Sequence, residues 1–203
     1  AATILPIYFN YIAGKQGLSD VQYLAYWGYA VSIATLLTAL AGPVFGTAAD
    51  TKGYKKPVFT IALGIGAIAS VALGFAKYWL AFLVVFVIAK VGYSVTLVFY
   101  DSMLVDVTSE DRMDEVSSQG YAWGYIGSCV PFVICLLVVL NAGKIGITME
   151  TAMMVSFVII TVWWVIMTLP LLKTYHQKYY VEKKQHAFSE SFKRDRKSTR
   201  LNS

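Results

Sequence analysis

Lys90 is the residue whose position in the sequence most directly suggests chemistry. It interrupts an apolar block that runs from Trp79 to about Tyr100. It lies about 11 residues, or about 16 Å of helix, beyond the start of that block, which is too deep for its ammonium to reach a membrane surface comfortably. A lone charge at that depth costs at least about 2.5 to 3.5 kcal/mol. We therefore expect Lys90 either to face a water-filled cavity, where it binds an anionic substrate group or takes part in proton coupling, or to pair with an acid.

Acidic residues form a second group with potential chemistry. Asp101, Asp106, Asp111 and Glu115 follow one another at intervals of four to five residues. Carboxylates so spaced could bind Mg²⁺ or Ca²⁺ in a membrane enzyme, but the segment 101–118 lacks the glycine turn and ligand spacing of a calcium-binding hand. We therefore expect an acidic loop without a metal site. In this loop Arg112 pairs with neighbouring acids, and Asp101 or Asp106 meets lysines of an earlier loop.

Long apolar helices must position these residues. Of the 203 residues, 57% are hydrophobic and only 14% are charged, whereas soluble domains carry about 25% charged residues. The apolar residues fall in blocks of about 20, the length that a helix needs to cross a bilayer, and strand-type alternation is absent. We predict an all-α polytopic membrane protein with six transmembrane helices, the first of them truncated, over about residues 1–13, 22–48, 57–76, 79–100, 119–140 and 150–172.

The remaining residues are polar. Residues 173–195 are predicted to be a cytoplasmic linker, which either lies as a helix on anionic membrane lipids or is solvated. Residues 196–203 are interpreted as a non-native tail; they carry three of the basic residues behind the formal net charge of +5, so we expect no nucleic-acid partner. The sequence has no nucleotide-binding glycine loop and no serine-hydrolase or zinc-protease motif. We therefore expect neither an ATPase role nor a cofactor.

The distribution of basic residues predicts the orientation in the membrane. If the loop between the second and third spans is cytoplasmic, its lysines, Arg112 and the basic residues of 173–194 all lie on the cytoplasmic side. The other side receives only Lys15, Lys77 and Lys144. This asymmetry satisfies the positive-inside rule.

The loop between the second and third spans reads Gly46-Thr47-Ala48-Ala49-Asp50-Thr51-Lys52-Gly53-Tyr54-Lys55-Lys56-Pro57. It resembles the loop signature of the major facilitator superfamily. The matching residues are Gly46, Asp50, Gly53, Lys55 and Lys56, whereas Thr51 and Tyr54 stand where the family usually has basic residues. We expect Gly46 to allow close helix approach, Gly53 to take a positive φ, Asp50 to cap or pair at the helix end, and both lysines to reach the cytoplasmic surface.

The resemblance implies one half of a twelve-helix secondary transporter that works by alternating access, with a small-molecule substrate bound between the halves. The missing C-terminal half of the same chain is then a partner. In this family the first and fourth helices line the cavity. The resemblance therefore makes Lys90, Tyr8, Asn10 and Tyr11 candidates for substrate binding or proton coupling, and the loop signature with Asp101, Asp106 and Arg112 a candidate cytoplasmic gate.

A second resemblance covers the segments 99–106 and 116–127, which read Phe-Tyr-Asp-Ser-Met-Leu-Val-Asp and Val-Ser-Ser-Gln-Gly-Tyr-Ala-Trp-Gly-Tyr-Ile-Gly. They are similar to a group that includes fungal vacuolar amino-acid effluxers and bacterial relatives. This suggests an amino acid or a related metabolite as substrate and the bacterial inner membrane as location. Gly120, Gly124 and Gly127 have the small-residue spacing of helix packing. A membrane enzyme that uses the acidic loop, and a scaffold without transport, are the alternatives.

Overall fold

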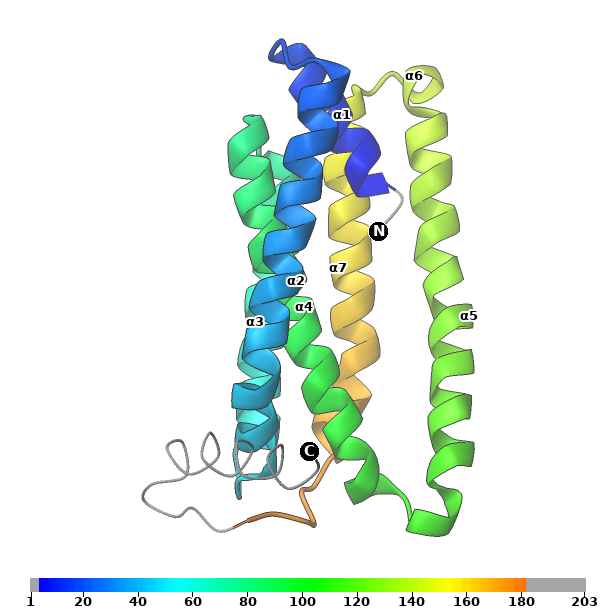
Figure 1. The fold of residues 1–203 in the computed structure, drawn as a ribbon. Coiled ribbons are helices and arrows are strands. Elements are labelled where there is room, and N and C mark those ends of the chain that lie inside the picture. The colour runs from blue at the N-terminus through cyan, green and yellow to red at the C-terminus, as the bar shows by residue number, and fades with distance from the viewer. Residues whose placement is uncertain (1–3, 182–203) are drawn as a thin grey trace.

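The computed structural model describes residues 4–181, and these form a helical bundle (Figure 1). Its helices are α1 (Ile4–Lys15), α2 (Asp20–Asp50), α3 (Lys55–Ala72), α4 (Trp79–Val107), α5 (Met113–Leu140), α6 (Ala142–Ile145) and α7 (Met149–Thr174). Short 3₁₀ turns follow α3 at Leu73–Phe75 and precede α5 at Glu110–Arg112. Within 4–181 the chain forms no strand, apart from one isolated bridge between Thr51 and Val181. The predictions for residues 182–203 lie outside the described residues.

Five helices are long and apolar enough to cross a membrane. They span Asp20–Asp50, Lys55–Phe75, Trp79–Val107, Glu110–Leu140 and Met149–Thr174. The predicted fold class, an all-α polytopic membrane protein, is therefore confirmed. At 12 residues, α1 is shorter than a complete span, which needs about 20.

Local sequence explains where two of these helices begin. The Ser19 hydroxyl accepts a hydrogen bond from the Gln22 amide, and the Gln22 side chain accepts one from the Ser19 amide, which forms a capping box at the start of α2. Thr148 caps α7 in the same way by accepting from the amide of Thr151.

The predicted acidic loop over 101–118 is wrong. α4 continues to Val107 and α5 begins at Met113, so residues 108–112 alone connect them. A helix can continue through acidic residues once it has left the apolar layer. It can also continue inside that layer if the carboxylate has a partner. Asp101 and Asp106 therefore occupy fixed positions on α4.

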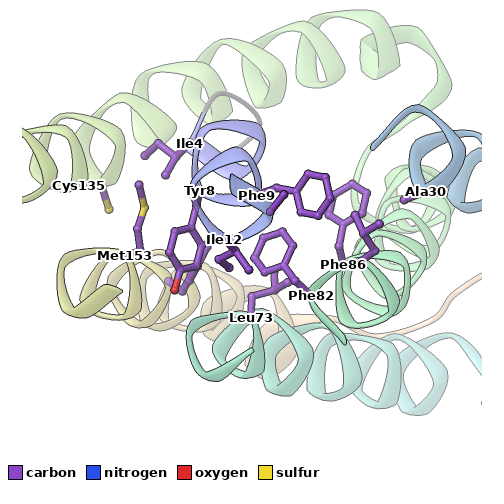
Figure 2. Packing of buried hydrophobic residues seen from close by; sticks show 13 residues of the cluster. Ile4, Tyr8, Phe9, Ile12, Ala30, Leu73, Phe82, Phe86, Cys135 and Met153 are labelled. Carbon is purple, nitrogen blue, oxygen red and sulfur yellow. The ribbon is translucent and has the colours of Figure 1, made fainter. Parts of the chain in front are cut away.

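α7 packs on α3 as well as on α5, so the helices form one connected bundle. α4 packs against both α2 and α3, whereas α5 stands to one side and packs mainly on α7 (Figure 1). At the end of the bundle that holds α6, a group of buried apolar residues, here called the outer cluster, joins α1, α2, α4, α5, α7 and the 3₁₀ turn after α3 (Figure 2). Its residues are Ile4, Tyr8, Phe9, Ile12, Ala13, Ala30, Leu73, Phe82, Leu83, Phe86, Cys135, Met153 and Phe157.

A second group, the inner cluster, lies at the end of the bundle that holds the turn between α2 and α3. It consists of Ala49, Phe59, Ala62, Val95, Phe99, Met103 and Tyr175. Between the clusters α3 and α4 approach closely at two glycines, because a Cβ added to Gly92 would lie 3.1 Å from the Cα of Gly66. This contact leaves no room for a side chain and fixes α4 against α3.

Candidate functional site

The turn at residues 51–54, between α2 and α3, has the backbone conformation that its sequence predicts. Gly53 has a φ of +76°, a left-handed conformation that glycine adopts without strain. Asp50 is exposed as the last residue of α2, and its carbonyl accepts a hydrogen bond from the Val181 amide at 2.7 Å. Gly46 differs from the expectation, because no heavy atom lies within 4 Å of where its Cβ would be. Gly46 therefore mediates no close helix packing among the described residues.

Lys55 and Asp106 form a buried ion pair at this end of the bundle. The Lys55 Nζ lies 2.8 Å from Asp106 Oδ2 and donates a second hydrogen bond of 2.8 Å to the Ser102 carbonyl. The Lys55 residue is only 2% exposed and Asp106 only 1%. The expectation that both loop lysines reach the surface is thus wrong for Lys55, whereas Lys56 is exposed. Burial places the pair where its electrostatic attraction is least screened.

Asp106 also binds the segment that follows α7. Its Oδ2 accepts a hydrogen bond of 2.5 Å from the Tyr175 hydroxyl, and its Oδ1 accepts from the amides of Lys178 and Tyr179, both at 2.9 Å. Burial, together with the hydrogen bond to Asp106 and its charge, raises the pKa of Tyr175 well above its ordinary value. The hydroxyl therefore stays protonated and remains a donor. We call Lys55, Asp106 and Tyr175 the inner latch.

The segment 175–181, here called the strap, runs across the turn between α2 and α3 and is drawn in orange in Figure 1. The Gln177 side chain accepts a hydrogen bond from the Gly53 amide at 2.8 Å and donates one to the Thr51 carbonyl at 3.2 Å. The Lys52 amide donates to the Val181 carbonyl at 3.2 Å. Strap, turn and the start of α3 line an open cavity of about 280 Å³, whose residues are Gly53, Lys56, Pro57, Tyr175, His176 and Gln177.

The strap differs from the prediction for this part of the chain. Residues 173–195 were expected to be either a helix on the lipid surface or a solvated linker, but the strap is not helical and Tyr175 is 3% exposed. Hydrophobicity identifies the chain only as far as the last apolar residues of α7, and a tyrosine close to a span end is usually an interfacial anchor. Only the position of Asp106 on α4 shows what Tyr175 binds.

Asp101 and Arg112 lie outside the inner latch. Asp101 is exposed on α4, and no ion pair to a loop lysine is found for it within residues 4–181. The Nε of Arg112 lies 3.3 Å from Oε2 of Glu115, and both side chains are more than half exposed. Of the two aspartates proposed to meet the loop, the structure brings only Asp106 to a lysine.

Lys90 lies exposed near the middle of α4. Its Nζ is 5.9 Å from the ring centroid of Tyr93, one turn further along. The Tyr93 ring in turn meets the Trp164 ring of α7 edge to face, with the centroids 5.7 Å apart. A cation and two aromatic rings thus lie together halfway along the bundle, on a side of α4 that the described residues leave uncovered.

The three candidates on α1 have different environments. Tyr8 is 2% exposed, and its ring packs in the outer cluster against Phe82, with the centroids 5.6 Å apart (Figure 2). Its position in the core of the bundle differs from the expected lining of a cavity. Asn10 is exposed. Tyr11 is half-buried, and its hydroxyl donates to Glu150 Oε1 at 3.2 Å, so it contributes to a contact between α1 and α7.

Among the described residues, two of the three α5 glycines that were predicted to mediate helix packing have no close neighbour. A Cβ on Gly120 would lie 3.4 Å from the Tyr100 hydroxyl, but no heavy atom lies within 4 Å of the Cβ positions of Gly124 and Gly127. The close helix contacts are made instead by Gly66, Gly74 and Gly92.

In the part of the chain that the structure describes, no group of three or more His, Cys, Asp or Glu side chains lies together in a way that could hold a metal ion. The acidic residues that the enzyme alternative requires are therefore spread over α4, the connection and α5. This arrangement does not favour a metal-dependent enzyme.

Comparisons with known proteins agree with this architecture. The family described as Major Facilitator Superfamily matches residues 1–199. The uncharacterized MFS-type transporter YxiO of Bacillus subtilis (strain 168) is 39% identical over 195 residues, which are 94% of this chain and 46% of that protein. The multidrug resistance protein MdtG of Proteus mirabilis (strain HI4320) is 39% identical over 74 residues, which are 36% of this chain and 17% of that protein. The chain thus spans less than half the length of these relatives, and no solved structure matches it.

Proposed function

The chain belongs to the major facilitator superfamily, and from this premise we propose that it forms the substrate-binding and gating elements of one half of a secondary transporter. The remaining part of a full-length protein supplies the other half, and the two halves rock about a site near the middle of the membrane. The protein is a multi-pass membrane protein. The excess of basic residues at the end that holds the turn between α2 and α3 favours a cytoplasmic position for that end, and we assign the protein to a bacterial inner membrane.

The exposed position of Lys90 halfway along α4 carries this proposal. If this side of α4 faced lipid, the ammonium would cost at least about 2.5 to 3.5 kcal/mol. A water-filled site between two halves removes that cost. Lys90 then attracts a carboxylate or another anionic group of the solute, and the neighbouring Tyr93 and Trp164 offer aromatic surface to its apolar part.

The substrate class follows from this chemistry. A small solute with a carboxylate and an apolar portion suits a lysine beside two aromatic rings, so we propose an amino acid or a related metabolite. The similarity of residues 99–106 and 116–127 to vacuolar amino-acid effluxers supports the same class. Asn10, exposed on α1, adds a neutral hydrogen-bonding group, and a proton or another ion drives transport.

The inner latch is the proposed cytoplasmic gate. Lys55 of α3 and Asp106 of α4 hold two helices together at the end that opens to the cytoplasm. A buried pair of this kind has two discrete states, formed or hydrated, because an intermediate separation leaves both charges unsatisfied. The latch therefore favours the state in which the cytoplasmic end is closed.

Flux measurements on the full-length protein in proteoliposomes test the proposed function. We expect uptake of a radiolabelled amino acid such as leucine or glutamate, driven by a pH gradient, and a loss of at least about tenfold with Lys90→Gln, since an ion pair with bound substrate is worth about 1.5 to 3 kcal/mol. Lys144→Gln, which changes an exposed lysine in α6, is the matched control. Unchanged flux by Lys90→Gln across pH 5 to 8 would refute the role of Lys90.

A further inference from the structure

We propose that the strap (residues 175–181) holds the inner latch closed, that Tyr175 and Gln177 are its positioning residues, and that the strap must release from the turn between α2 and α3 before the cytoplasmic end of the bundle opens. The inference rests on the proposed transport function and adds a third element to its gate. Nothing in the sequence of the strap indicates that it binds the turn between α2 and α3.

The strap supplies most of the hydrogen-bond donors that hold Asp106. Four donors reach its carboxylate within 2.9 Å, and three of them belong to the strap: the Tyr175 hydroxyl and the amides of Lys178 and Tyr179. Only Lys55 comes from α3. Burying a carboxylate is costly unless its lone pairs are satisfied. Without the strap, Asp106 would keep one of its four donors, and water would have to replace the others.

The strap is also bound to the turn itself. Gln177 contacts the backbone of the turn at Gly53 and Thr51, and Val181 exchanges backbone hydrogen bonds with the residues on either side of Thr51. Since the same short segment binds the turn at one place and Asp106 at another, it bridges α4 to the loop signature. The end of α4 can therefore move away from the turn only if the strap releases either the turn or Asp106.

The way the strap is held allows such a release. Of the strap residues, only Tyr175 is buried, and it lies in the inner cluster. His176 and residues 178–181 are exposed. The contacts beyond Tyr175 are mainly hydrogen bonds, and folding exchanges these for hydrogen bonds to water at a small net cost. The exposed part of the strap can therefore detach without uncovering the apolar core.

A reversible crosslink tests whether release is required. Paired residues of a β-bridge lie about 5 Å apart, within the range of a disulfide, so we choose Thr51→Cys with Val181→Cys in a full-length background carrying Cys129→Ala and Cys135→Ala. Leu97→Cys, on the exposed side of α4, reports opening through its alkylation by a membrane-impermeant maleimide in inside-out vesicles. Mass spectrometry of the peptide that contains position 97 gives the rate.

We expect the disulfide between positions 51 and 181 to slow alkylation at position 97 at least about tenfold, because the crosslinked strap prevents the bundle from reaching its open state. A reductant should restore the rate. The same reporter with Val181→Cys alone is the control and should not respond to oxidant. A disulfide that forms without changing the alkylation rate would show that the strap stays in place during opening and would overturn the proposal. A pair that does not oxidise would contradict the strap geometry.

Hydrogen exchange gives a second readout that is independent of transport. The amides of Lys178 and Tyr179 both donate to Oδ1 of Asp106, so Asp106→Ala, which removes this acceptor, should speed their exchange about tenfold or more. Asp101→Ala, which changes an exposed aspartate on the same helix, should not. Equal exchange in both variants would overturn the strap proposal even if Lys90-dependent flux were observed. A response confined to Asp106→Ala, together with Lys90-independent flux, would support the strap and reject the proposed role of Lys90.

Discussion

Removing one charge of the inner latch should cost different amounts depending on which partner is changed. Lys55 donates two hydrogen bonds, to Asp106 and to the Ser102 carbonyl, whereas Asp106 accepts from four donors. Lys55→Met removes the charged donor from Asp106 and leaves it with three others. Asp106→Asn removes the ion pair and weakens every other hydrogen bond of the carboxylate. Asp106→Asn is therefore the more damaging substitution.

The expected losses of stability can be worked out from these hydrogen bonds. One charge-assisted hydrogen bond is worth about 1.5 to 3 kcal/mol, which is the expected loss for Lys55→Met. For Asp106→Asn we expect about 3 to 5 kcal/mol, the cost of leaving the buried Lys55 ammonium without a carboxylate partner. Lys55→Met costs less because three other donors still reach the Asp106 carboxylate. The double variant should lose less than the sum of the single losses, by about 1 to 3 kcal/mol, because each single substitution already breaks the shared ion pair.

The free energy of unfolding of the full-length protein, measured by titration with SDS in mixed micelles, provides the comparison. Asp101→Asn is the control, since Asp101 is exposed on the same helix and should change stability by less than about 0.5 kcal/mol. A loss for Lys55→Met that equals or exceeds the loss for Asp106→Asn would refute the reasoning. Additive losses in the double variant would show that the two residues do not interact.

Three further substitutions test other parts of the bundle. Gly92→Ala should cost about 1 to 3 kcal/mol, because the added Cβ would lie 3.1 Å from backbone atoms of Gly66, whereas Gly64→Ala meets no atom within 4 Å and should be neutral or stabilising in the same unfolding titration. Tyr175→Phe should cost about 1.5 to 3 kcal/mol, the value of one hydrogen bond to a charged group. Because the pKa of Tyr175 is raised above its ordinary value near 10, this loss of stability should be the same at about pH 6 and about pH 9. A loss that disappears by pH 9 would contradict a protonated donor. Arg112→Gln should change stability by less than about 1 kcal/mol, since its ion pair with Glu115 is exposed, and a larger loss would indicate an interaction that the structure does not show.

The sequence predicts the spans well because apolar length alone defines them. The blocks that begin near 22, 57, 79, 119 and 150 all correspond to helices of the structure. The ends of the helices are harder to predict, since a helix continues past the apolar layer as long as its polar residues find water or a partner. Asp106 shows the difficulty: its charge suggested a loop, but the carboxylate is buried and the helix runs one residue beyond it.

The contacts of the inner latch could not be predicted because they join residues that are far apart in the sequence. From the sequence we expected Asp101 or Asp106 to meet lysines of the loop between the second and third spans, but the sequence could not choose between the two aspartates. That choice depends on the rotation of α4 about its axis, which is set by packing at Gly66 and Gly92. The role of Tyr175 depends on the same rotation, because its hydroxyl reaches Asp106 from a segment 69 residues away.

The charged residues of α4 divide between two sides of the helix, and this division links the proposed site to the proposed gate. At 3.6 residues per turn, Asp101 lies about 20° around the helix from Lys90, whereas Asp106 lies about 160° from it. Lys90 and Asp101 are accordingly exposed, and Asp106 is buried against Lys55 and the strap. Because one continuous helix carries both sets, α4 joins the proposed solute site at Lys90 to the proposed gate at Asp106. We propose that movement of this helix, together with α3 on which it is fixed at Gly92, connects the two without a separate relay of side chains.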